Sequence, residues 1–455
     1  MLRLSGGQVE SLFDEALPIE VRELPEDLAR LDELLGDPAL LAPIAERWDL
    51  AARERGRPTI AMAVYVRLMV IRQRTGWGYE TLVREVSDSL HLRRFCLIAI
   101  SERVPDESTV RKLTRRLGPD VVDELTRVVI AKAQRERRFV ARAMRCDSTV
   151  VEADVRWPSD AGLALDATRA LAREGRRVAA TVGAGARRVQ DRSRAAGRRL
   201  RLIGRTMARR TDDKKALVLR LTGETGELVR RSVREARKLA AQARAKARGR
   251  GAAGKLAAAR RLDELADRAE TIARQITQRL AGERITDRLV SLADPDARPI
   301  GKGKAGKRYE FGYVFQLAEL TPNTRRGARG LILPAASQIG SPNETDLLPA
   351  TAAELERLGL RPREVALDGG FDPGVAQRTL PDGAAIFVAG RQAPASRRSR
   401  RRLAGYRVGC EGRISHLKRR YGLRRSRLKG HAGAMTHVGW AILTYNLDTL
   451  AIRTD

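Results

Sequence analysis

The feature that most constrains the fold is a short apolar segment with a carboxylate inside it, at residues 139–151. Its apolar positions are Val140, Met144, Cys146, Val150 and Val151. Because charged residues bound this run, it predicts a short buried strand. A carboxylate in such a strand is costly unless an arginine or a divalent metal compensates it. Asp147 is therefore either a turn residue, a common position for aspartate, or one of several acids that converge on a ligand.

A second apolar segment ends in the same way. Residues 364–368 read Glu-Val-Ala-Leu-Asp, and two glycines follow Asp368. Glycines permit a sharp turn and a close approach of the backbone. Asp147 and Asp368 are therefore both expected at the C-terminal ends of strands, where α/β sheets collect ligands.

A third carboxylate, Glu411, lies in a segment of helical periodicity. One face of this helix would carry Ala404, Arg407, Glu411, Ile414 and Lys418. Two strands and a helix could then bring together three carboxylates, the oxygen ligands that Mg²⁺ takes. Two Mg²⁺ or Mn²⁺ ions there would activate a water or a 3′-hydroxyl and stabilise the leaving oxygen in phosphodiester displacement. The competing interpretation is an ordinary ion pair between Glu411 and Arg407.

The charge of the chain points to a polyanionic partner. Its 455 residues include 88 Lys and Arg against 56 Asp and Glu, a formal net charge of +32. Arginine suits bidentate phosphate contacts. Aromatic residues make up only 4% of the chain, so base stacking is an improbable mode of binding. The length predicts two or three domains.

Other compartments and partners are disfavoured by the sequence. No apolar run of about 18 residues is long enough to span a membrane, and the N-terminus lacks the apolar core of a signal peptide. The cysteines, Cys96, Cys146 and Cys410, are too widely spaced for a disulfide framework or a zinc motif. A reduced, cytoplasmic protein associated with the nucleoid is expected.

The first 137 residues predict short helices, over residues 25–55, 60–74, 79–90, 104–118 and 119–136. The fourth begins at Asp106 and ends at Gly118, as N-cap and C-cap preferences suggest. It carries Arg111, Lys112 and Arg115, which are candidates for DNA contacts in a helix-turn-helix. A plain helical bundle with a solvated basic face fits the pattern equally well.

Beyond the Asp147 segment, residues 163–288 are rich in Ala, Arg and Leu and predict long antiparallel helices or a coiled coil. This basic block is either an arm that contacts DNA or a set of solvated helical faces. Strands are predicted at residues 289–292, 309–320, 330–337 and 384–389. Helices are predicted at residues 343–358, around 406–421 after a basic run at 397–402, and at 432–452.

Three motifs resemble the DDE transposases of bacterial insertion sequences. They are Asp147-Ser-Thr-Val-Val-Glu-Ala-Asp, Leu367-Asp-Gly-Gly-Phe-Asp372, and the segment from Arg407 through Glu411 to Lys418. In this family Tyr, Arg, Glu and Lys are separated by two, three and six residues. The last two gaps match, whereas Ala404 stands at the Tyr position and Tyr406 falls on another face. Residues 76–110 and 294–345 also resemble the family's helical domain and central strands.

The resemblance implies an α+β multidomain fold with a ribonuclease H-like α/β core. Its parts would be an N-terminal helical DNA-binding domain (1–137), the first part of the core (138–157), a long helical basic insertion (158–288), and the remaining core with C-terminal helices (289–455). It implies a transposase that cleaves and transfers strands of double-stranded DNA at the ends of the element. Asp147, Asp368 and Glu411 would be catalytic metal ligands, and Arg407 and Lys418 would hold phosphates.

A homodimer in the synaptic complex is likewise implied by the resemblance alone. The alternatives are a ribonuclease H-like nuclease or resolvase with the same acids, and a non-catalytic basic DNA-binding protein derived from a transposase.

Overall fold

A computed structural model describes residues 1–6, 15–48, 58–208, 211–301 and 308–452 of the chain. Its contacts divide it into two compact units, Met1–Asp154 with Gly312–Asp455, and Val155–Phe311. The second unit is therefore inserted into the sequence of the first. The mixture of many helices with a mixed sheet confirms the predicted multidomain α+β class, while the ribonuclease H-like assignment and the predicted domain limits stay predictions.

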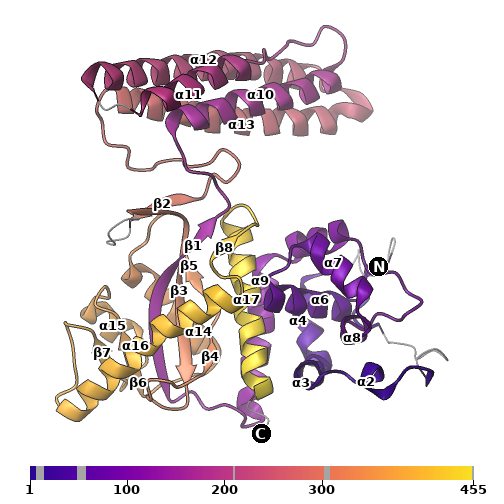
Figure 1. Ribbon diagram of the computed structural model, residues 1–455, viewed down its shortest axis with the longest axis vertical. Helices are drawn as coiled ribbons and strands as arrows, with labels where there is room; N and C mark the ends of the chain where they lie inside the picture. The colour runs from indigo at the N-terminus through magenta and orange to yellow at the C-terminus, as the bar shows by residue number, and fades with distance from the viewer. Residues whose placement is uncertain (7–14, 49–57, 209–210, 302–307, 453–455) are drawn as a thin grey trace. The chain divides into compact units, whose positions relative to one another are not determined.

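The first unit begins with a series of helices, the last of which is the longest (Figure 1). They are α2 (Ile19–Arg22), α3 (Glu26–Leu35), α4 (Ala42–Arg47), α6 (Met62–Thr75), α7 (Tyr79–Asp88), α8 (Leu90–Phe95) and α9 (Glu107–Arg135). As predicted, Asp106 is the N-cap of α9. Gly118 interrupts α9 with φ 69° and ψ −170°, so two helices meet there at a kink. Glycine adopts this positive φ without a steric penalty.

The sheet of the first unit follows the order β3-β1-β6-β7. Its strands are β1 (Ala143–Ala153), β3 (Tyr309–Thr321), β4 (Leu331–Ile332), β5 (Ala336–Ser337), β6 (Glu364–Leu367), β7 (Ala385–Val388) and β8 (Arg425–Ser426). β3 runs antiparallel to β1, whereas β6 and β8 run parallel to β1 and β7 parallel to β6. The remaining helices are α14 (Glu344–Arg357), α15 (Pro373–Thr379), α16 (Arg397–Arg420) and α17 (His431–Ile452).

Alternation along β1 gives the two faces of the sheet different partners. Met144 and Cys146 belong to the large apolar core that also contains side chains of α3, α6, α9 and α17. Ala143 faces the other way and packs with Leu403 and Tyr406 of α16. Asp147 is in phase with Ala143, so it lies on the face that α16 covers.

Several details differ from the predicted elements. The helix predicted at 25–55 is divided into α3 and α4, and its residues 49–55 lie outside the described residues. Residues 289–292 form no strand, because Leu289 and Leu292 are buried among helices of the second unit. The predicted strand at 330–337 is split into β4 and β5, with Pro334, which lacks a backbone donor, between them. The basic run at 397–402 belongs to α16, which begins after its N-cap Ser396.

The second unit contains the helices α10 (Asp160–Val182), α11 (Ser193–Thr206), α12 (Asp212–Ala245) and α13 (Ala252–Leu280), and the strand β2 (Arg298–Gly301) (Figure 1). Small and branched apolar residues fill the seam between α10, α12 and α13, among them Ala164, Ala240, Ala266, Leu239, Leu262 and Ile272. Small side chains let long helices approach closely, which explains the alanine-rich composition of this block.

None of the helices within the described residues is long and apolar enough to span a membrane.

Candidate metal centre

Asp147 and Asp368 lie side by side because β1 and β6 are parallel. Their register pairs Cys146 with Leu367, and each aspartate is the next residue of its chain. Asp368 directly follows β6, as the sequence predicts. Asp147 lies in the middle of β1 rather than at its end, because β3 continues to pair with β1 as far as Glu152.

A tight turn follows Asp368 and brings the backbone close to neighbouring groups. A Cβ atom at Gly369 would lie 2.9 Å from the carbonyl oxygen of Ala389. A Cβ atom at Gly370 would lie 2.3 Å from Oε2 of Glu344. Gly370 therefore leaves room for the carboxylate of Glu344, and Gly369 leaves room for the backbone of Ala389.

Glu344 is a third acid of this site that sequence reasoning missed. Oxygens of Asp147, Glu344 and Asp368 all lie within 4.8 Å of one another, the one such group of carboxylates among the described residues. Glu344 is the first residue of α14, whose N-cap Asn343 forms a capping box with Asp346. An acid in the first turn is ordinary for a helix, so its position in the sequence did not mark it as a ligand.

The side chain of Gln316 on β3 fixes the beginning of α14. Its Nε2 donates to the carbonyl oxygen of Glu344 over 2.7 Å, and its Oε1 accepts from the hydroxyl of Thr351 over 2.6 Å. Gln316 is fully buried, so both of its polar groups are satisfied within the protein. This residue thereby holds Glu344 near the two aspartates.

Burial and repulsion from neighbouring acids raise the pKa of Asp147 and of Glu344. Burial, with the charges of Asp368 and Glu411, raises the pKa of Asp147 to about 6, against the lowering effect of the Ser148 N–H. Burial, with the charges of Asp147 and Asp368, raises the pKa of Glu344 to about 7. Such shifts arise where like charges share a half-buried site.

Arg407 is the basic group that reaches these acids. Its guanidinium donates to Oδ1 of Asp368 over 3.0 Å and lies 3.7 Å from Oε1 of Glu411. Glu411 is one turn away on α16 and its side chain is 65% exposed. Arg407 thus connects Glu411 to Asp368, but Glu411 is not one of the three clustered carboxylates. The ion pair and a ligand role are both compatible with this position.

A buried network anchors α16 to the sheet. Arg145 of β1 donates to Oε2 of Glu319 from Nε and Nη2, over 2.8 and 2.6 Å. Arg413 of α16 donates to the other oxygen of Glu319 over 2.8 Å. Arg145 also donates to the carbonyl oxygen of Tyr406 over 3.1 Å. The helix that carries Arg407 and Glu411 is therefore held by two arginines and one shared acid.

Gly409 makes this contact between α16 and Arg145 possible. A Cβ atom there would lie 1.9 Å from Nη1 of Arg145 and 2.4 Å from the carbonyl oxygen of Arg326. Tyr406 belongs to the same core, where its hydroxyl bonds that of Thr321 over 2.6 Å. Ala404 is partly buried in this cluster.

The residues predicted to contact DNA lie on two helices of the first unit. Lys112 and Arg115 are exposed on α9. Arg111 is half-buried, forms an ion pair with Glu107, and lies 5.7 Å from the ring centre of Tyr79. Lys418 is half-buried on α16, two turns beyond Glu411. Their role in DNA binding stays a prediction.

The three clustered acids fit a divalent metal. Oε2 of Glu344 is buried without a hydrogen-bond partner in the described part of the chain, an arrangement that is costly for a carboxylate unless a cation accepts the charge. All the donor atoms are carboxylate oxygens, the ligands that hard ions such as Mg²⁺ take. The group could therefore hold a metal ion.

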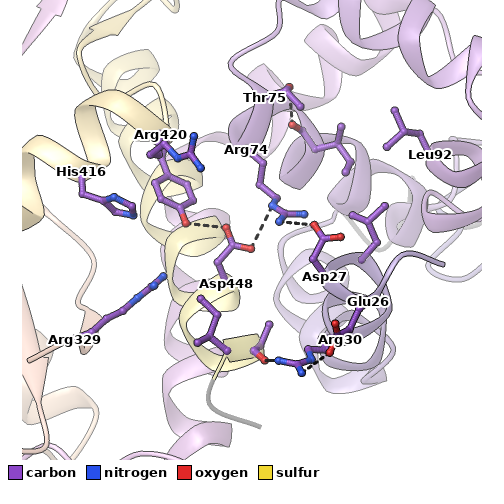
Figure 2. A pocket seen from close by; sticks show the side chains of 15 residues that line it. Glu26, Asp27, Arg30, Arg74, Thr75, Leu92, Arg329, His416, Arg420 and Asp448 are labelled. Carbon is purple, nitrogen blue, oxygen red and sulfur yellow. Dashed lines mark hydrogen bonds and ion pairs between the residues drawn. The ribbon is translucent and has the colours of Figure 1, made fainter. Parts of the chain in front are cut away.

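The first unit also contains a cavity in which the acids are paired with other side chains (Figure 2). This cavity of about 710 Å³ lies among α3, α6, α16 and α17. Arg74 bridges Asp27 over 2.8 Å and Asp448 over 3.3 Å, and the hydroxyl of Tyr421 donates to Asp448 over 2.8 Å. Because its acids are neutralised by the protein itself, this hollow does not resemble a metal site.

Part of the N-terminal helical segment matches a known protein family. Residues 19–116 match the model of a family described as "Transposase domain (DUF772)", a stretch that runs from α2 into α9. The comparisons with curated proteins and with solved structures found no match. The family match supports a transposase function for the chain.

Proposed function

We propose that the protein is a DNA transposase that cleaves and joins strands at the ends of a mobile element, with divalent metal held by Asp147, Asp368 and Glu344. The observation that carries the proposal is the approach of three carboxylates within 4.8 Å in a chain whose helical segment matches a transposase family. The net charge of +32 suits a DNA substrate.

Each group has a role that follows from its position. Asp147 and Asp368 present oxygens from neighbouring strands, and Glu344 adds one from the first turn of α14. Arg407 orients Asp368 through their 3.0 Å contact, and Glu411, on the exposed side, is available as a further ligand. Two Mg²⁺ or Mn²⁺ ions, when bound, would activate a water or 3′-hydroxyl and stabilise the leaving oxygen. Lys418 and the basic residues of α9 would hold phosphates, and two copies of the chain would pair two DNA ends.

The test is product analysis with the full-length chain and a linear duplex that carries the DNA flanking its own gene. We expect nicks at the element ends in Mg²⁺, joining of the 3′-hydroxyl ends to a target duplex, and neither product in EDTA. Asp368→Asn should remove both activities while the protein still binds DNA.

Asp372→Asn is the matched control, because Asp372 caps α15 by accepting from the N–H of Val375 over 2.8 Å and asparagine caps equally well. Nicking without joining would indicate a nuclease or resolvase instead. Full activity of Asp368→Asn, or activity in EDTA, would contradict the proposal.

A further inference from the structure

Helix α11 (Ser193–Thr206) of the second unit carries five arginines and no acidic residue. Four of them, Arg194, Arg198, Arg201 and Arg205, follow one another at intervals of four, three and four residues. Because positions three and four apart share a helix face, these four side chains form one row. We call them the α11 arginine row. All four are exposed, and no hydrogen bond or ion pair joins them to another described residue.

The opposite face of α11 fixes the direction in which the row points. Ala196, Gly197 and Ile203 are buried, and Ile203 packs with Ala161 of α10 and Leu221 of α12. The helix is therefore held by its apolar side against two longer helices. Its arginine row is directed to the surface of the second unit.

Many other arginines of the same unit are paired with acids, although the exposed Arg220, Arg231 and Arg234 of α12 form no ion pair with another described residue. On α12 and α13, six arginines form ion pairs: Arg230 with Glu227, Arg237 with Asp267 and Glu270, Arg244 with Asp263, Arg261 with Glu174, Arg268 with Glu264, and Arg279 with Asp160. Even on α11, the fifth arginine, Arg199, contacts Glu224 over 2.6 Å. Unlike these paired arginines, the four of the row share one helix face and receive no counter-charge from the described residues. Like charges at these spacings repel and destabilise a helix unless a counter-charge is supplied.

We propose that the α11 arginine row binds the phosphate backbone of duplex DNA. The row is about 16 Å long at the usual helical rise, and one DNA strand presents a phosphate about every 3.4 Å along the duplex axis. It therefore faces about five phosphates, enough for each guanidinium to contact one. This inference rests on the proposed function, since it gives the transposase a second contact with its substrate in the inserted unit.

Two other anionic partners fit less well. Helix α11 contains no aromatic residue, so it offers no platform on which bases of a single strand could stack. A membrane-surface helix must insert an apolar face into lipid, whereas that face of α11 is covered by α10 and α12. The exposed Leu202 is a single side chain and offers too little apolar area.

The test replaces the row in the full-length chain with R194Q/R198Q/R201Q/R205Q. Binding to a duplex of random sequence is measured over a range of salt concentrations. The slope of log K against log salt is negative, and each lost phosphate contact makes it shallower by about 0.9. We expect the slope to become shallower by about 3 to 4 and the affinity at low salt to fall about tenfold or more.

The matched control is R230Q/R237Q/R244Q/R268Q, which removes the same charge from ion-paired positions of the same unit. It should change the slope by less than about 1. Equal effects in the two variants, or an unchanged slope in the row variant, would overturn the inference, as would a loss of binding only to anionic vesicles.

Failure of this inference can be distinguished from failure of the proposed function. The row variant should bind with a shallower slope whether or not the wild type nicks DNA, whereas Asp368→Asn should bind with an unchanged slope and not nick. Circular dichroism of each variant shows whether the helices are retained.

Discussion

Two groups of charged side chains on one sheet differ in how their charge is balanced. Around Glu319, one acid is shared by Arg145 and Arg413, and the acid is only 2% exposed. Around Asp368, three acids cluster, Arg407 contacts one of them, and the side chain of Asp368 is 41% exposed. In the first, sealed group the acid is fully paired with arginines and is shielded from solvent. In the second, open group the acids outnumber the one arginine and are accessible to solvent, an arrangement that suits a cation.

The largest effect in this comparison is expected from breaking the sealed group. Glu319→Ala would leave two buried guanidinium groups without their acid, and such losses cost about 3–5 kcal/mol. Urea unfolding measures the change. Asp147→Asn, which removes a charge from the open group, should leave the stability in EDTA unchanged or higher. If both variants lost the same stability, the distinction between the groups would be wrong.

A glycine beside the sealed group gives the next effect. Gly409→Ala would force a Cβ atom against Arg145 and against the carbonyl of Arg326, and the overpacking should cost about 3 kcal/mol. Gly412→Ala is the control on the same helix, because no atom lies within 4 Å of a Cβ atom there. If Gly409→Ala and Gly412→Ala were equally stable, the close packing of Arg145 against Gly409 would not contribute to holding α16.

The open group should make stability depend on pH when no metal is bound. The pKa of Asp147 rises from 3.8 to about 6, and that of Glu344 from 4.5 to about 7. The folded state therefore binds protons more tightly than the unfolded state between pH 4 and 7. Stability from these groups is present at the acidic end and is lost as pH rises. At full value the two shifts would correspond to about 3 kcal/mol each, and solvent screening of these partly exposed acids reduces the total to a few kcal/mol.

Urea midpoints at pH 5 and pH 8 in EDTA measure this loss. The double variant Asp147→Asn/Glu344→Gln corrects for all other titrating groups and should show a smaller difference between the two pH values. An identical difference in wild type and variant would mean that folding does not raise the pKa values of Asp147 and Glu344.

The smallest effect is expected from neutralising Glu344 alone. Glu344→Gln removes repulsion with the two aspartates and should stabilise the metal-free protein at pH 8 by about 1 kcal/mol. It should also weaken Mn²⁺ binding, because one ligand oxygen loses its charge. Glu356→Gln, further along α14 and exposed, is the control. Destabilisation by Glu344→Gln with unchanged Mn²⁺ affinity would give Glu344 a purely structural role.

The sequence predicted much of what forms this site. The segments around Asp147 and Asp368 are strands as expected from their apolar runs, and α14 lies within the helix predicted at residues 343–358. These features are local, so a single stretch of sequence contains the signal. Arg407 and Glu411 share a face of α16 because helical spacing requires it.

What could not be predicted depends on contacts between distant segments. Glu344 reaches the aspartates because Gln316 holds the start of α14, and nothing in the sequence relates residue 316 to residue 344. The position of Asp147 within a long strand depends on how far β3 extends. The apolar run at 289–292 is buried by helices rather than by strand pairing, and apolar composition alone does not distinguish these two cases.

The most direct test of the central claim is the binding of a divalent cation to the acid group. In a thermal unfolding assay at pH 8, increasing Mg²⁺ or Mn²⁺ should raise the melting temperature of the wild-type protein, because an ion that binds only the folded state stabilises it. Asp147→Asn/Asp368→Asn should show no such rise. A similar rise in both proteins, or none in the wild type, would contradict the account.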